Sequence, residues 1–182
     1  MRLRPLPADQ WDEATQRALS LMRGADTNNA LSTLAHHPAL ARAFLRFNVH
    51  LLAASTLPPR IRELAILRVA HRRQCAYEWS HHVRMAKDEG ITDDQIAAVQ
   101  DGATTDDDVL DAFDRAVIAG VDELEENSQL SDRIWAVLGE RLNDQQRMDF
   151  VFTVGCYALL AMAFNTFGVQ LEHTATAATN VE

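Results

Sequence analysis

A thiol, two carboxylates and an imidazole lie along residues 63–82 at a spacing that could support proton transfer or nucleophilic chemistry. Glu63 is followed by Cys75, Glu78 and His82, with 11, two and three residues between successive members. At 100° per residue, Cys75, Glu78 and His82 fall within an arc of about 60° on one helix face. That face therefore presents three groups that serve as nucleophiles, acids and bases near neutral pH.

Each of these residues also has a structural interpretation. Glu63 falls on a segment that is apolar on nearly all sides, where a carboxylate must be paired with an arginine or protonated. Glu78 and His82 could form a helix-stabilising pair worth about 0.2–0.5 kcal/mol. Cys156 lies among apolar residues and is interpreted as a small core residue. His81, about 100° from the reactive face, is interpreted as a rim residue.

The pattern predicts neither a metal site nor a nucleic-acid site. Closed zinc or di-iron sites need a second ordered cluster of ligands, which the sequence lacks, so we expect no metal and no other cofactor. The arginines between residues 60 and 73 scatter around their helix, and the formal net charge is -9. We therefore expect a small-molecule substrate and no nucleic-acid partner.

The elements that must position these residues are helices. Apolar residues recur at helical spacing almost throughout, and no segment alternates as a half-buried strand should. Capping patterns open three of the helices, at Thr92 with Gln95, at Thr105 with Asp108, and at Ser131. The remaining helices are predicted over about residues 9–22, 38–54, 60–73, 75–89 and 144–172. The predicted fold class is an all-α helical bundle.

The chain is predicted to form a single domain, because 182 residues with 47% apolar content suffice for one core and no linker divides them. We assign residues 1–30 to an N-terminal helix and loop, 31–172 to the helical domain, and 173–182 to a flexible tail. Residues 150–171 carry no formal charge over 22 positions. Polar residues within this segment, and the lack of a basic anchor after it, favour a buried core helix over a membrane span.

The number of cysteines indicates the cellular compartment of the protein, and the distribution of charge suggests how subunits could associate. Two cysteines make no disulfide framework, and the start of the chain has no apolar signal core, so we expect a cytoplasmic protein. Residues 1–87 hold 13 basic and six acidic side chains, whereas residues 88–182 hold four basic and 20 acidic ones. The two halves are either solvated faces of different sign or surfaces through which like subunits dock.

The chain resembles the carboxymuconolactone decarboxylase superfamily, which includes the alkylhydroperoxidase D-like (AhpD-like) proteins. The resemblance rests on the spacing from Glu63 to His82 and on two stretches, Leu57-Pro-Pro-Arg-Ile-Arg-Glu-Leu64 and Cys75-Ala-Tyr-Glu-Trp-Ser-His-His82. Its specific part covers about residues 31–100, and the whole chain has the size and helical order of the family. The resemblance implies an AhpD-like helical bundle and a homo-oligomer, as a dimer, trimer or hexamer that buries helix faces between subunits.

The resemblance points to two branches of the superfamily. The peroxidase branch has a Glu, a Cys-x-x-Cys pair and a His that form a proton relay with a redox-active disulfide. Glu63, Cys75 and His82 match three of those positions, and Glu78 stands at the fourth, in place of the second cysteine. The decarboxylase branch is similar at Glu78 and His82 but lacks the cysteine and the upstream glutamate. The chain combines features of both branches.

Three functions follow as hypotheses. The first is a peroxide-handling, AhpD-like oxidoreductase that uses Cys75 with a Glu/His proton relay, for which an external thiol or dithiol would reduce the sulfenic acid. The second is a cofactor-free lyase or isomerase acting on a small carboxylated lactone or keto acid. In it, His82 and Glu78 exchange protons while Glu63 or an arginine orients the substrate. The third is a non-catalytic oligomeric assembly protein in which the polar cluster is a buried network.

Overall fold

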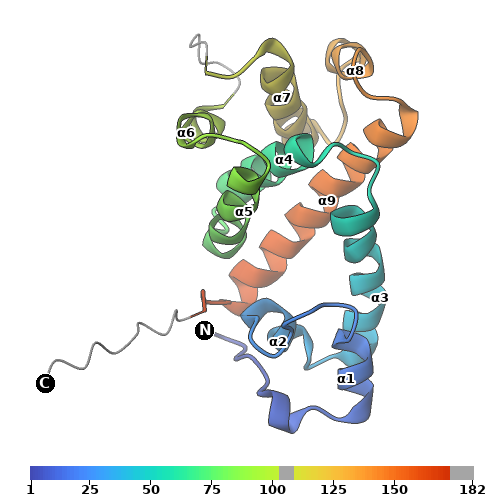
Figure 1. The fold of residues 1–182 in the computed structure, drawn as a ribbon, viewed down its shortest axis with the longest axis vertical. Helices are drawn as coiled ribbons and strands as arrows, with labels where there is room; N and C mark the ends of the chain where they lie inside the picture. The colour runs from blue at the N-terminus through green and yellow to red at the C-terminus, as the bar shows by residue number, and fades with distance from the viewer. Residues whose placement is uncertain (103–108, 173–182) are drawn as a thin grey trace, which may run out of the picture.

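The computed structural model describes residues 1–102 and 109–172, which form helices and contain no strand (Figure 1). In chain order the elements are η1 (Ala8–Gln10), α1 (Glu13–Leu19), α2 (Asn29–Leu34), α3 (Pro38–Val49), the π-helix η2 (His50–Ala54), α4 (Pro59–Arg72), α5 (Ala76–Asp88), α6 (Asp93–Asp101), α7 (Ala112–Asn127), α8 (Asp132–Gly139) and α9 (Asp144–Phe167). The predicted all-α, single-domain bundle is confirmed.

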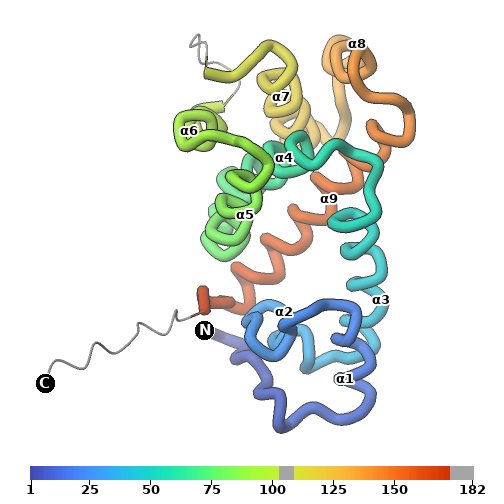
Figure 2. Tube along the Cα trace, in the orientation of Figure 1, coloured from blue at the N-terminus to red at the C-terminus, as the bar shows by residue number. Residues whose placement is uncertain are grey.

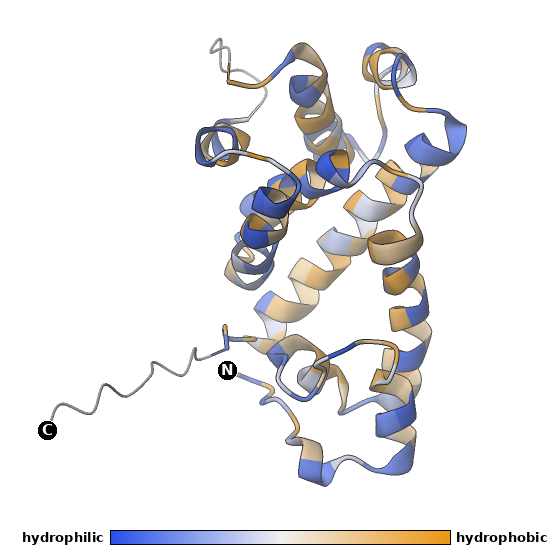
Figure 3. Cartoon of the chain, in the orientation of Figure 1, coloured by the Kyte–Doolittle hydropathy of each residue, from blue (hydrophilic) through white to orange (hydrophobic). Residues whose placement is uncertain are grey.

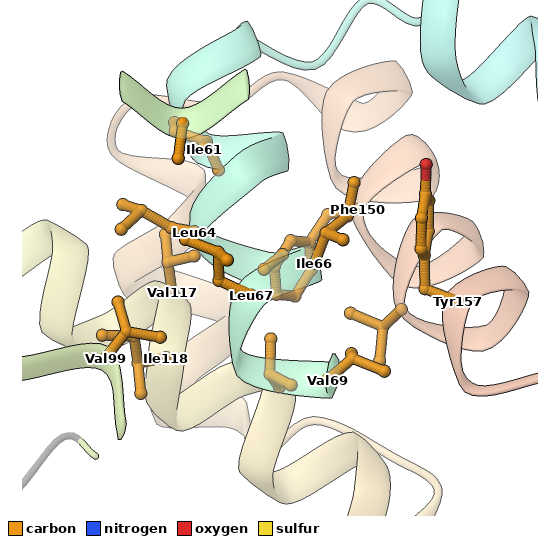
Figure 4. Close-up of a cluster of buried hydrophobic side chains, with 14 of the residues drawn as sticks. Ile61, Leu64, Ile66, Leu67, Val69, Val99, Val117, Ile118, Phe150 and Tyr157 are labelled. Carbon is orange, nitrogen blue, oxygen red and sulfur yellow. The ribbon is translucent and has the colours of Figure 1, made fainter. Parts of the chain in front are cut away.

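The central element is α4, around which α5, α6, α7 and α9 pack (Figure 1). Its sequence is apolar on nearly all sides, and every residue from Ile61 to Ala70 is buried. In Figure 4, Leu64 and Leu67 lie on the side of Val117 from α7, and Ile66 lies near Phe150 from α9. Because a close-packed helix has little freedom to move, α4 can hold polar side chains in fixed positions.

The N-terminal helices form a second, smaller core. Leu19, Leu31 and Leu45 from α1, α2 and α3 belong to this cluster, which is separate from the larger one around α4. Phe44 of α3 packs against both clusters. In Figure 2, α1 and α2 lie at the end of the molecule opposite α7 and α8. A seam between two cores is a preferred place for a ligand cavity.

Several helix boundaries differ from the sequence prediction. The first predicted helix is divided into η1 and α1, because the Asp12 side chain caps α1 by accepting a hydrogen bond from the backbone N–H of Thr15. Residues 29–34 form an additional helix, α2, which spans the boundary assigned at residue 30 and is capped by Asn28. The last predicted helix ends at Phe167 and not near residue 172, because Gly168 adopts a left-handed φ of +71°.

Two of the three predicted capping patterns are confirmed, and the third lies outside the described residues. The capping box of Thr92 and Gln95 opens α6, and Ser131 caps α8, as predicted. The predicted cap at Thr105 and Asp108 lies outside the described residues, and α7 begins later, with Asp111 as its N-cap. The predicted tail, residues 173–182, also lies outside the described part of the chain.

In the described residues, α9 is the one helix long and apolar enough to cross a membrane. Half of its most apolar window is nevertheless buried inside the molecule. Phe150, Tyr157 and Phe164 are among the buried residues that join it to the larger core. The structure therefore agrees with the interpretation of this segment as a core helix.

Candidate functional site

A tight turn between α4 and α5 brings Cys75 back against α4. Gln74 adopts a left-handed φ of +51°, and the backbone N–H of Cys75 donates to the carbonyl oxygen of Ala70 at 2.9 Å. Cys75 is the N-cap of α5, so Glu78 lies in the first turn of this helix and His82 one turn later. All three side chains are buried, as the helical spacing indicates for one shared face.

Glu63 and His82 form a buried pair that α4 and α5 hold together. His82 Nδ1 donates to Glu63 Oε2 at 2.7 Å, and Glu63 Oε1 accepts from Arg62 Nε at 3.1 Å. The ion pair with an arginine that was expected for Glu63 is therefore present. Because Nδ1 is bound to a carboxylate, Nε2 is the imidazole nitrogen available for proton exchange.

The helix-stabilising pair that was considered for Glu78 and His82 is not formed. Within the described residues, no hydrogen bond or ion pair joins these two side chains, and His82 bonds to Glu63 instead. No group of three His, Cys, Asp or Glu side chains in the same part of the chain is arranged to hold a metal ion. Of the four predicted site residues, Glu63 and His82 are therefore the two that bond to each other within the described chain.

Glu78 is a buried carboxyl group with unsatisfied oxygens. Its residue is only 2% exposed, and neither oxygen has a hydrogen-bond partner of ordinary geometry among the described residues. Burial raises the pKa of Glu78 from 4.5 to about 8, while the neighbouring Cys75 thiol lowers it by a smaller amount. Glu78 is therefore largely protonated at neutral pH but titrates close to it.

Cys75 is a neutral thiol and not an activated thiolate. Its pKa is raised from 9.0 to about 12, mainly by burial and secondly by the negative charge of ionised Glu78. The thiol is therefore protonated at neutral pH. Any nucleophilic role for Cys75 therefore needs a base beside it, and Glu78 occupies that place.

Tyr157 on α9 also belongs to the site, although no spacing in the sequence marks it. Its ring meets the His82 ring edge-on, with centroids 5.0 Å apart. Burial raises the pKa of the Tyr157 hydroxyl well above 10, and the charges of Glu63 and Glu78 add to this effect. Tyr157 therefore lies near both Glu63 and Glu78.

Cys156 is buried, as its apolar surroundings predict, but it is not remote from the site. Its sulfur accepts a weak hydrogen bond from Asn48 Nδ2 at 3.7 Å. Burial raises the pKa of the thiol to about 11, and the charge of Glu78 contributes to the rise. Glu78 therefore influences both cysteines of the chain. Both cysteines are free thiols.

Three of the four predicted site residues line two different hollows. A cavity of about 190 Å³ at the seam of the two cores is lined by Glu78 and His82, mostly together with apolar residues of α2, α3 and α9. Within the described chain, neither arginine nor lysine lines this cavity. Cys75 lines a more open hollow of about 540 Å³, which also contains Arg68. Glu63 lines neither of them.

His81 lies at the edge of the cavity and not with the buried pairs. Its side chain is 32% exposed and its Nε2 lies 2.9 Å from Glu172 Oε2. Tyr77, which also lines the cavity, donates its hydroxyl to Glu172 Oε1 at 2.6 Å. The chain that follows α9 is therefore fastened to α5 beside the cavity. This position agrees with the interpretation of His81 as a rim residue.

Residues 38–122 match the sequence profile of the Carboxymuconolactone decarboxylase family. These residues contain α3 to α6, all four predicted site residues and the start of α7. This match assigns residues 38–122 to the carboxymuconolactone decarboxylase family, and the chain as a whole has the fold of AhpD-like proteins. No curated protein sequence matches the chain significantly.

Solved structures share the fold at low sequence identity. A peroxidase-related protein from Ralstonia eutropha JMP134 with an alkylhydroperoxidase AhpD core has a TM-score of 0.73 and 21% identity, with 95% of this chain and 94% of that chain covered. A peroxidase-related protein from Silicibacter sp. TM1040 has a TM-score of 0.73 and 17% identity, with 90% of this chain and 87% of that chain covered. The debrominase Bmp8, as a cysteine-to-alanine variant in complex with 2,3,4-tribromopyrrole, has a TM-score of 0.73 and 15% sequence identity. The alignment covers 95% of this chain and 92% of that chain.

Proposed function

We propose that the protein is a thiol-dependent oxidoreductase that reduces small peroxides at Cys75. The observation that carries this proposal is the placement of the buried Cys75 thiol beside Glu78, whose pKa of about 8 suits a proton acceptor near neutral pH. The fold similarity to peroxidase-related proteins supports thiol chemistry. So does the similarity to a debrominase that was crystallised as a cysteine variant with its brominated ligand.

The proposed reaction begins with a proton transfer from the thiol to ionised Glu78. The Cys75 thiolate then attacks one peroxide oxygen, the O–O bond breaks, and the sulfur becomes a sulfenic acid. The leaving alkoxide takes this proton from Glu78, which returns Glu78 to its ionised form. Glu63 acts as a positioning residue, because its 2.7 Å bond to Nδ1 fixes the orientation of the imidazole.

An external dithiol would complete the cycle. The first thiol attacks the sulfenic sulfur and releases water, and the second thiol displaces Cys75 from the mixed disulfide. Cys75 lines the open hollow of about 540 Å³, and the reductant would approach from this side. A reducing cytoplasm would supply the dithiol and keep both free cysteines as thiols.

The cavity favours an uncharged, apolar substrate. Its volume of about 190 Å³ lies below the range of roughly 300–1,000 Å³ that is usual for ligand pockets. Its lining includes Phe44, Leu160 and Phe164 but, in the described chain, no arginine that could bind a substrate carboxylate. An uncharged molecule fits this environment better than a carboxylated lactone or keto acid, and a peroxide would reach Cys75 from the open hollow of about 540 Å³ that Cys75 lines.

A second function, acid–base catalysis without a redox step, is favoured by one observation. Glu78 and His82 line the small cavity, whereas Cys75 does not. A protonated Glu78 and a neutral imidazole could act as acid and base on an uncharged carbon acid or lactone. This lyase or isomerase would not need the sulfur atom.

The decisive experiment compares two matched cysteine variants with the wild-type protein. The purified chain is treated with cumene hydroperoxide, with dithiothreitol as reductant, and peroxide consumption is measured. Sulfenic acid is trapped with dimedone and located by mass spectrometry. We expect trapping at Cys75, loss of at least 100-fold in rate for Cys75→Ser, and a retained rate for Cys156→Ser.

The pH dependence provides an additional test of the role of Glu78. Below about pH 8, the ionised fraction of Glu78 rises tenfold per pH unit, so the peroxide rate should rise correspondingly and level off near pH 8. A peroxide rate that is unchanged in Cys75→Ser would refute the proposal. Turnover of a lactone by the Cys75→Ser variant would assign the site to the second function.

A further inference from the structure

The cavity at the seam of the two cores has a mostly apolar wall that includes polar groups of α5. We call it the seam cavity, and its volume is about 190 Å³. Glu78 and His82 of α5 line it, and α9 contributes Tyr157, Leu160 and Phe164. Figure 3 shows α9 as pale or orange over most of its length. Because neither arginine nor lysine of the described chain lines the seam cavity, an uncharged ligand suits it.

Glu78 is a polar side chain of this wall without a protein partner, whereas other polar side chains of the wall have one. Asn28 Oδ1 accepts from the backbone N–H of Leu31 at 2.9 Å, and His81 Nε2 lies 2.9 Å from Glu172 Oε2. Glu78 is only 2% exposed, and neither of its oxygens has a hydrogen-bond partner among the described residues. A buried polar group without a partner costs stability, so a ligand that bonds to Glu78 would recover this loss.

Glu78 and His82 have the spacing and the complementary polarity to hold one hydroxyl group between them. Residues four apart on a helix have Cβ atoms about 5–6 Å apart, and His82 bonds to Glu63 and not to Glu78. His82 Nδ1 donates to Glu63, so Nε2 of the neutral ring is an acceptor. Burial raises the pKa of Glu78, so its carboxyl group is a donor at neutral pH. A ligand hydroxyl donates to the first group and accepts from the second, whereas an ether has no proton to donate.

The volume and the aromatic wall of the seam cavity favour a ligand with one aromatic ring. An apolar cavity of about 150 Å³ is large enough for benzene. The seam cavity, at about 190 Å³, therefore accommodates one ring with a hydroxyl group and a small substituent. Phe44, Tyr157 and Phe164 line it and offer edges and faces against which such a ring packs.

We propose that the seam cavity binds an uncharged phenol, whose hydroxyl group donates to Nε2 of His82 and accepts from Glu78. Cys75 lines a different hollow, so the phenol does not occupy the space beside the sulfur. Binding nevertheless opposes the peroxide reaction, because the phenol bonds to protonated Glu78 and the reaction needs the ionised form. This second effect rests on the proposed function, whereas the binding itself does not.

The test is titration calorimetry of the full chain with para-cresol, at about pH 6.5 and without peroxide. We expect a dissociation constant below about 1 mM. The methyl ether of para-cresol, which cannot donate to Nε2, should bind at least tenfold more weakly, and the para-toluate anion should not bind. An absence of binding by para-cresol would refute the proposal. So would equally tight binding of para-xylene, which would show an apolar cavity without hydroxyl recognition.

Variants locate the ligand and test its bond to Glu78. Glu78→Leu should weaken binding of para-cresol at least tenfold, whereas Glu78→Gln, whose amide still donates, should stay within about threefold of the wild type. Ala30→Leu fills the seam cavity and should abolish binding, and the matched control is Ala43→Leu, an exposed position of α3 outside the cavity. Circular dichroism shows whether each variant folds.

A peroxide assay separates the binding site from the proposed function. Saturating para-cresol should slow peroxide reduction by the wild type at least threefold. Unchanged binding of para-cresol by Glu78→Leu would refute the site. Tight binding of para-cresol by a chain that reduces no peroxide would support the site and refute the proposed function alone.

Discussion

Replacing Glu78 with glutamine should stabilise the protein at neutral pH and inactivate it. Glu78 is buried with no hydrogen-bond partner among the described residues, and burial raises its pKa from 4.5 to about 8. In the folded chain the carboxyl stays protonated until about pH 8, whereas in the unfolded chain it ionises above about pH 4.5. Its ionisation therefore favours the unfolded chain across this window.

The magnitude follows from the size of the pKa shift. One pKa unit corresponds to about 1.36 kcal/mol, so this group lowers the free energy of unfolding by about 3 kcal/mol between pH 4.5 and pH 7. The loss reaches about 5 kcal/mol above pH 8, where both states are ionised and the curve levels off. Because glutamine does not ionise, the Glu78→Gln variant escapes this loss.

Urea unfolding of the wild type and of Glu78→Gln at pH 5, 7 and 8 measures the effect. The difference in unfolding free energy should move in favour of the variant by about 3 kcal/mol between pH 5 and pH 8. Glu89→Gln, which removes an exposed carboxylate at the end of the same helix, is the matched control. A difference that stays constant with pH for Glu78→Gln would show that Glu78 is ionised in the folded protein, which would refute the reasoning.

The remaining predictions concern the other buried contacts, and each is measured by urea or thermal unfolding. Glu63→Gln weakens the pair with His82 and removes the charge that balances Arg62. We therefore expect the free energy of unfolding to fall by about 3 kcal/mol, and an unchanged value would contradict the buried-pair geometry. Gly120→Ala should destabilise by about 1 kcal/mol, because the new Cβ lies 3.3 Å from Phe150 in a packed core; a gain in stability would show that the core yields there. Thr153→Val should stabilise by about 1 kcal/mol, because the Thr153 hydroxyl is buried without a partner among the described residues; a loss would indicate an undetected hydrogen bond.

Local signals in the sequence predict most of the helices and their caps. The capping box at Thr92 and the cap at Ser131 are confirmed, because each depends on atoms within four residues of one another. Two helix ends were predicted at the wrong residue because of single residues nearby. Asp12 caps α1 inside the first predicted helix, and Gly168 ends α9 earlier than predicted. The short helix α2 lacks the length needed for a periodic signal.

The sequence by itself determined the fold class and the buried face shared by Cys75, Glu78 and His82, since helical periodicity places residues three and four apart on one side. The resemblance to the superfamily rests on the motif from Glu63 to His82. Only the tertiary structure decided which of these groups meet. It joined His82 to Glu63, 19 residues away on another helix, and left Glu78 without a hydrogen-bond partner in the described chain. It also brought Tyr157 from α9 into the site. Packing between helices sets these contacts and the desolvation that shifts each pKa, and neither is encoded in the spacing along one helix.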